Sequence, residues 1–164
     1  MPVDHIEHMT IKNLPAVPEE SEQLELVRIL ASNPDRFRML FLQLSADLRI
    51  HARYALLNEW AHKYDLKSVN ITDFTLDVMN AIHDGTWLTT LKHWEEPDIL
   101  LVDGLDLIIG SNTVQEIFYT SVLKPRLEKM RLTVLFSEKG YTELSFLMRD
   151  DLKNLLKLGF HAPD

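Results

Sequence analysis

The chain has 164 residues, 46% of them hydrophobic and 26% charged, which suffices for one globular domain with its own core. It has no cysteine, no apolar run long enough to span a membrane and no signal-peptide segment, which excludes a disulfide framework and favours the cytoplasm. The net charge of −8 disfavours nucleic-acid binding as the main activity, since clustered Lys and Arg are needed to neutralise phosphates.

Periodicity predicts helices and strands that alternate along the chain. Residues 1–20 hold three of the seven prolines and are expected to form an extended N-terminal arm, followed by a single domain over residues 21–164. Apolar residues at helix spacing predict helices at 21–33, 52–64, 72–83, 86–94, 113–123 and 148–158. Short apolar runs predict strands at 39–44, 67–71, 98–103 and 132–136. In the helix over 72–83, Phe74, Val78 and Ile82 are expected to face inward.

This alternation predicts an α/β fold, a three-layer sandwich with a mainly parallel sheet of four to five strands and helices on its faces. In such sheets ligands bind beyond the carboxyl ends of the strands. We therefore expect the residues that follow three strands, 45–47, 103–104 and 137–138, to share one edge.

The strand over 98–103 carries the clearest functional signal. Its apolar run ends in Asp103, as in the strand that places a carboxylate beside Mg²⁺ in phosphate-binding nucleoside triphosphatases. The matching Gly-rich loop, which ends in Gly-Lys-Ser/Thr, is expected earlier in the chain. No glycine occurs between Met1 and Asp84. One half of a nucleotide site is present and the other is missing.

Several stretches resemble the AAA+ core of the DnaA/Hda family of replication initiators, and they occur in the same order. Val114-Gln-Glu-Ile-Phe-Tyr119, for example, is similar to the family's Thr-Gln-Glu-Glu-Phe-Phe helix. The other stretches are 70–85, 98–110, 135–138 and 149–159. The resemblance covers residues 38 to 159 and implies a P-loop NTPase (AAA+)-like fold. Few residues follow position 159, so we expect neither the lid domain nor the DNA-binding domain of the family.

The departures from the family all fall on nucleotide chemistry. The position of the phosphate loop (Walker A) lacks both the glycines and the lysine that a phosphate cradle needs. Asp47 would repel a triphosphate, while Arg49 or His51 could replace only the charge of the lysine. Gly104 stands where a second carboxylate follows Asp103 in the Walker B strand. The degenerate positions are Ser45, Ala46, Asp47, Arg49 and His51 in the loop, Asp103 and Gly104 in Walker B, Phe136 and Ser137 at the sensor, and Leu155 at the arginine finger.

The lost motifs imply a pseudo-ATPase, a non-catalytic protein without cofactor or metal that acts by binding proteins. The resemblance implies a role in regulation or assembly of DNA replication initiation. The expected partner is a DnaA-type initiator or the replicative helicase, and the mechanism would be mimicry of a subunit face. A homodimer is kept as an alternative.

Two other functions stay open at this stage. A divergent nucleotide- or metal-dependent enzyme could use Asp103 with an unusual cation such as Arg49. Asp103, alone or with Asp98 and Asp106, could also hold Mg²⁺, although Mg²⁺ needs several convergent oxygens. A DNA-binding accessory factor could use the basic cluster, which consists of Lys124, Arg126, Lys129 and Arg131. Trp87 and Trp94 lie at helix spacing and either pack over the sheet or form a contact patch. The candidate partner contacts are Trp87, Trp94, Lys124, Arg126, Lys129 and Arg131.

Overall fold

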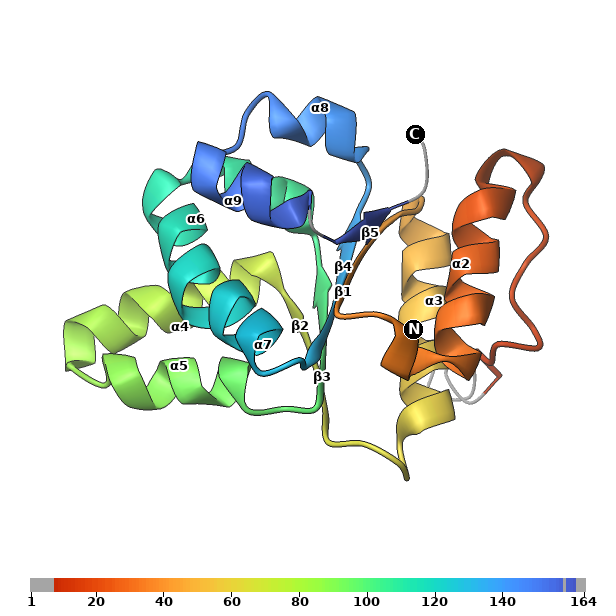
Figure 1. Cartoon of the computed structure of the whole chain (residues 1–164), viewed down its shortest axis with the longest axis horizontal. Helices are drawn as coiled ribbons and strands as arrows, with labels where there is room; N and C mark the ends of the chain where they lie inside the picture. Colours follow the sequence, from red (N-terminus) through yellow and green to blue (C-terminus); the bar gives the residue numbers. More distant parts are fainter. Residues whose placement is uncertain (1–7, 158, 162–164) are drawn as a thin grey trace.

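Five parallel strands form the centre of the computed structural model, which describes residues 8–157 and 159–161 (Figure 1). Their order across the sheet is β2-β3-β4-β1-β5, and each neighbouring pair is parallel. The strands are β1 (Met39–Gln43), β2 (Leu66–Asn70), β3 (Ile99–Asp103), β4 (Leu132–Ser137) and β5 (Phe160–His161). The predicted α/β sandwich with a mainly parallel sheet of four to five strands is confirmed.

Helices cover both faces of this sheet (Figure 1). One face carries α2 (Ser21–Ser32) and α3 (Ala46–Trp60), with the short turns η1 (Pro18–Glu20) and η2 (Pro34–Arg36) beside them. The other helical elements are α4 (Ile71–Asp84), α5 (Trp87–Glu95), η3 (Leu105–Gly110), α6 (Asn112–Phe118), the π-helical η4 (Tyr119–Leu123), α7 (Lys124–Glu128), α8 (Tyr141–Ser145) and α9 (Asp150–Leu156). No helix in the described part of the chain is long and apolar enough to cross a membrane.

The central strands are apolar throughout because both of their faces are buried. In β3, Leu101 points to the core beneath α2 and α3, while Leu100 and Val102 point to the core on the opposite face. In β4, Val134 and Leu135 divide between the two cores in the same way. Since successive side chains of a strand point to opposite faces, a continuous apolar run satisfies both layers.

Several predicted boundaries are corrected. The helix expected from residue 52 begins at Ala46, because Leu48 extends the buried stripe of Ala52 and Ala55 by one turn. The helix expected to be capped by Thr72 begins at Ile71, and Asn70 Oδ1 accepts the Asp73 N–H at 2.8 Å.

The C-terminal part also differs from the prediction. The helix expected over 148–158 is α9, which spans Asp150–Leu156, and position 158 lies outside the described residues. The short helix α8 was not predicted. Near β5, Gly159 lies so close to β1 that an added Cβ would come within 3.1 Å of the Met39 carbonyl oxygen.

The N-terminal segment lies against the domain over its described part. Leu14 is buried in the core that α2 and α3 share. The Asn58 side chain donates to Met9 O (2.9 Å), and His51 Nε2 lies 3.3 Å from Thr10 O. Residues 8–17 are therefore joined to α3, and residues 1–7 of the predicted arm lie outside the described residues.

Candidate functional site

Three strand ends meet at the carboxyl edge of the sheet, as the sequence predicts. β1 and β4 run in register with Gln43 opposite Ser137, and Leu44 N–H donates to Ser137 O (3.0 Å). From α3, which follows β1, Arg49 reaches Asp103 at the end of β3. The residues expected to share this edge do share it.

Asp103 is held by two arginines of α3. Arg49 Nε lies 3.0 Å from Asp103 Oδ1, and Arg53 Nη1 lies 3.6 Å from Oδ2. Arg49 also donates through Nη1 to Leu44 O (2.9 Å), which fixes its side chain across the end of β1. The three charged side chains are largely shielded from solvent. A metal ion at Asp103 would have to displace one or both guanidinium groups.

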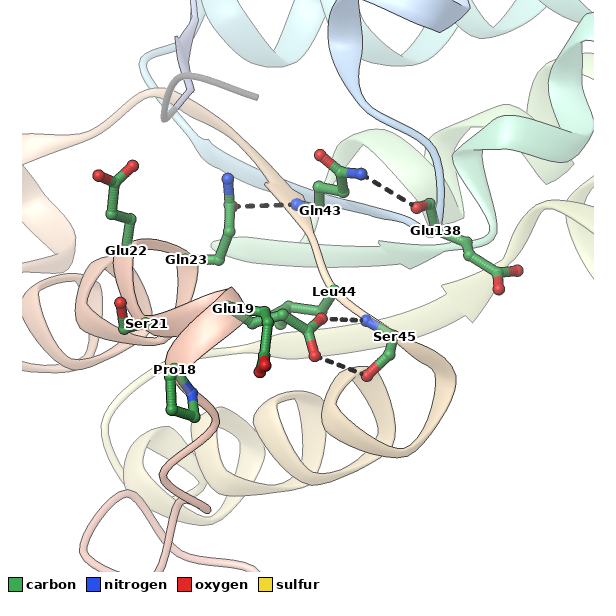
Figure 2. A pocket seen from close by; sticks show the side chains of 10 residues that line it. Pro18, Glu19, Ser21, Glu22, Gln23, Gln43, Leu44, Ser45 and Glu138 are labelled. Atoms are coloured by element: carbon green, nitrogen blue, oxygen red, sulfur yellow. Dashed lines mark hydrogen bonds between the residues drawn. The ribbon is translucent and has the colours of Figure 1, made fainter.

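A glutamate side chain of the same chain forms hydrogen bonds with the N-cap residue of α3. Glu20, at the end of η1, accepts the Ser45 N–H at Oε1 (2.6 Å) and the Ser45 hydroxyl at Oε2 (3.0 Å) (Figure 2). Helix N-termini attract anions because their first N–H groups are unpaired and the helix dipole is positive there. In this chain the Glu20 carboxylate lies at the N-cap of α3, the helix whose first turn holds the degenerate phosphate-loop positions.

The cavity beside this helix end is acidic. It has a volume of about 490 Å³ and lies between the start of α2, the end of β1 and Glu138 (Figure 2). Glu19, Glu20, Glu22 and Glu138 line it, and the described lining includes no Lys or Arg. On the cavity wall, Gln23 Oε1 accepts the Gln43 N–H at 3.0 Å, which ties α2 to β1. The charge of the cavity opposes binding of a phosphate.

The carboxylates considered with Asp103 do not converge on it. Asp98 precedes β3 at its amino end, where its Oδ2 accepts the Asp65 N–H (2.9 Å). Asp106 Oδ1 accepts the Glu138 N–H and lies 3.3 Å from Ser137 Oγ, so it holds the end of β4. Over residues 8–157 and 159–161, no group of three or more His, Cys, Asp or Glu side chains is placed to hold a metal ion.

Solved structures share this arrangement of strands and helices. Domain III of the replication initiation protein DnaA from Thermotoga maritima has a TM-score of 0.82 at 19% identity, over 95% of this chain and 68% of that one. AMPPCP-bound DnaA from Aquifex aeolicus has a TM-score of 0.80 at 17% identity, over 94% of this chain and 49% of that one. The chain has the fold of the DnaA AAA+ domain. A putative primosome component from Streptococcus pyogenes serotype M3 has a TM-score of 0.72 at 12% identity, over 99% of this chain and 90% of that one.

The similarity to these proteins was found by comparing structures and not by comparing sequences. No family model and no curated protein matches the sequence. The chain spans about half the length of the Aquifex DnaA structure.

The remaining candidate positions hold buried packing residues at the sensor and finger, a turn glycine after β3 and residues of α3 in place of the loop. Gly104 adopts φ of +73°, a left-handed conformation that an aspartate or glutamate rarely adopts. Phe136 is fully buried beneath α2 and α3, and Leu155 is buried in the opposite core. Ser137 Oγ is fully buried and donates to Lys139 O (2.7 Å). The loop position His51 faces the N-terminal segment, and Asp47 is exposed in the first turn of α3.

The structure corrects the expectation that Arg126 lies on a basic surface. Its guanidinium is fully buried between α7, the end of α5 and the start of β4. It donates to the carbonyl oxygens of Pro97 (2.7 Å), Leu132 (2.7 Å) and Glu95 (2.9 Å) and to Thr133 Oγ1 (2.9 Å). Burial lowers the pKa of Arg126 to about 10, so it is still cationic at neutral pH. Arg126 is a structural residue.

The other basic residues do not form a free cationic face either. Lys129 forms an ion pair with the Glu95 carboxylate, and Arg131 donates to Glu95 O (2.8 Å). Lys124 is exposed. Within the described residues, burial of Arg126 and the ion pair of Lys129 leave Lys124 and Arg131 as the charges that this cluster offers to DNA, fewer than a phosphate-binding patch needs.

The two tryptophans differ in burial. Trp94 is buried, with its ring centroid 5.0 Å from that of Phe74 and with Lys67 Nζ 4.5 Å above it. Trp87 is half-buried against the same core. Trp94 therefore packs in the core, the first of the two alternatives, and is not available as a partner contact.

In α4, Ile82 is expected to face inward but is exposed.

Proposed function

We propose that this protein is a pseudo-ATPase that acts through protein–protein binding in the regulation or assembly of DNA replication initiation. The observation that carries the proposal is the occupancy of both halves of the ancestral site by the chain's own side chains. Arg49 and Arg53 neutralise Asp103, and Glu20 binds the N-terminus of α3.

Electrostatics support the absence of nucleotide binding. A triphosphate at this edge would meet Glu20, Asp47 and Glu138 without a Gly-rich loop to hold it. Mg²⁺ would have to compete with guanidinium groups for Asp103. Hydrolysis would also lack the carboxylate that Gly104 replaces. We infer that neither half of the site supports binding or catalysis.

The proposed setting comes from the fold. The similar structures are replication initiators and a protein described as a primosome component, and the proposed setting follows theirs. We propose a DnaA-type initiator or the replicative helicase as the partner, in the cytoplasm. A DnaA-like face would dock as a subunit does, and the joint site would lack the arginine finger and bound nucleotide that make it active.

The test is complex formation with the purified initiator and the purified replicative helicase of the host. Size-exclusion chromatography with light scattering should show a complex with at least one of them. The complex should not require that this chain itself binds ATP. Absence of a complex with both proteins would contradict the proposed partners. ATP hydrolysis by this chain that Asp103→Ala abolishes would instead support a divergent enzyme.

A further inference from the structure

Helices α4 and α5 expose large apolar side chains. Leu76, Met79 and Ile82 of α4 are 53%, 60% and 57% exposed, and Leu88 in the first turn of α5 is 75% exposed. Figure 1 shows the two helices side by side at one end of the molecule, on the opposite face of the sheet from α2 and α3. We call these four side chains and the helix faces that carry them the α4–α5 surface.

This surface is rigidly supported from below. Phe74, Val78 and Ala81 on the inner side of α4 are buried, and Phe74 contacts both Trp94 (5.0 Å between ring centroids) and Phe118 (5.3 Å). Gly85 ends α4 with φ of +70° and turns the chain into α5. The exposed residues therefore occupy a side of α4 that its own core does not use.

The charges beside the apolar side chains of α4 are acidic, whereas α5 carries an exposed lysine, Lys92, four residues after Leu88. Asp73, Asp77 and Asp84 are exposed on α4, and their spacing of four and seven residues places them on one stripe of the helix, adjacent to Leu76. The α4 sequence contains no Lys or Arg. Phosphates and anionic lipid headgroups would be repelled there. A second copy of the chain would bring like charges together in a two-fold pairing.

We propose that the α4–α5 surface docks a protein segment that presents apolar side chains flanked by lysine or arginine, such as a basic amphipathic helix. Apolar anchors with a polar rim are the usual composition of a binding site for such a helix. The charges complement the aspartate stripe of α4 and the net charge of −8 of the whole chain. The inference rests on the proposed function and names the docking face within it.

The probes are two synthetic amphipathic peptides that share one leucine stripe, one with lysines and the other with glutamates on its flanks. Fluorescence anisotropy with the full chain should show saturable binding of the lysine peptide only. The double variant Leu76→Ser/Met79→Ser should weaken that binding by at least about tenfold. The matched control is Phe146→Ser/Leu147→Ser, which removes side chains that are 83% and 56% exposed outside α4 and α5 and should leave binding unchanged.

A charge reversal distinguishes electrostatic recognition by the aspartate stripe from non-specific hydrophobic binding. Asp77→Lys/Asp84→Lys should weaken binding of the lysine peptide and create binding of the glutamate peptide. Equal effects of the two serine double variants, binding of both peptides to the wild type, or no saturable binding would each overturn the proposal. A dimer in sedimentation that Leu76→Ser/Met79→Ser dissociates would assign the surface to a second copy and also overturn it.

The proposed function and the docking face fail separately. A complex with the initiator or the helicase that survives Leu76→Ser/Met79→Ser overturns the docking face and leaves the function standing. Peptide binding that follows the predicted pattern, without a complex with either protein, supports the docking face and contradicts the proposed partners.

Discussion

At the scale of single residues, the Asp103 carboxylate is balanced by two guanidinium groups of α3. Its place at the end of an apolar strand indicates a Mg²⁺-binding carboxylate, and the structure pairs it with Arg49 and Arg53. The sequence shows that the phosphate loop is missing. It does not show that arginines one helical turn apart on α3 reach across to the carboxylate.

The ion pairs of Asp103 should contribute to stability. Asp103→Asn leaves two largely shielded guanidinium groups without their counter-charge, and we expect the free energy of unfolding in urea to fall by about 1–3 kcal/mol. In a double-mutant cycle with Arg49→Met, the coupling energy should be about 0.5–3 kcal/mol. A coupling near zero would mean that the pair behaves as a solvent-exposed one.

Arg126 should matter far more than its neighbours in the basic cluster. Arg126→Met leaves the buried carbonyl groups of Pro97 and Leu132 without a donor and should cost about 3–5 kcal/mol in urea denaturation. The control Lys124→Met, at an exposed position, should change stability by less than about 0.5 kcal/mol. Should Arg126→Met fail to fold, Arg126→Lys should fold with reduced stability, because an ammonium has fewer donors. Equal stability of Arg126→Met and Lys124→Met would contradict the buried network.

At the scale of elements, the contact of Glu20 in η1 with Ser45 at the start of α3 is the one that the sequence pattern predicts least. Glu20→Ala removes a carboxylate from the N-terminus of a 15-residue helix and should lower stability by about 1 kcal/mol. Hydrogen exchange of the Ser45 amide should accelerate in this variant. The neighbouring exposed residue provides the control, and Glu19→Ala should change neither quantity. The same loss in both variants would show that the contact is dispensable.

The elements differ in how far the sequence could predict them. The central strands were predictable because burial on both faces gives continuous apolar runs. The family resemblance places a phosphate loop at the first turn of α3, although Leu48 continues the apolar stripe of that helix. Spacing places Ile82 on the same face as Phe74 and Val78, but in the packed helix Ala81 is buried and Ile82 is exposed.

At the scale of the whole molecule, the loss of nucleotide motifs was predictable and their replacements were not. Missing glycines and a missing lysine are properties of the sequence. Glu20 meets Ser45 across 25 positions, and Arg126 meets carbonyl oxygens about 30 positions away. Contacts of a side chain with a distant backbone leave no periodic pattern. For that reason the sequence alone does not distinguish the buried Arg126 from the exposed basic residues beside it.

The charge distribution of the whole chain predicts negligible affinity for DNA. With a net charge of −8, with Arg126 buried and with Lys129 paired, single- and double-stranded oligonucleotides should not bind saturably in anisotropy measurements at low salt. Lys124→Glu/Lys129→Glu should change nothing. Salt-sensitive binding that this variant weakens would support the DNA-binding alternative.

The most direct test of the central claim is isothermal titration of the full chain with ATP and with ADP in the presence of Mg²⁺. Because Glu20 and the arginines around Asp103 occupy both halves of the site, no saturable binding should appear below about 1 mM. The midpoint of thermal unfolding should likewise not rise with added nucleotide. Micromolar binding that Asp103→Ala abolishes would contradict the account.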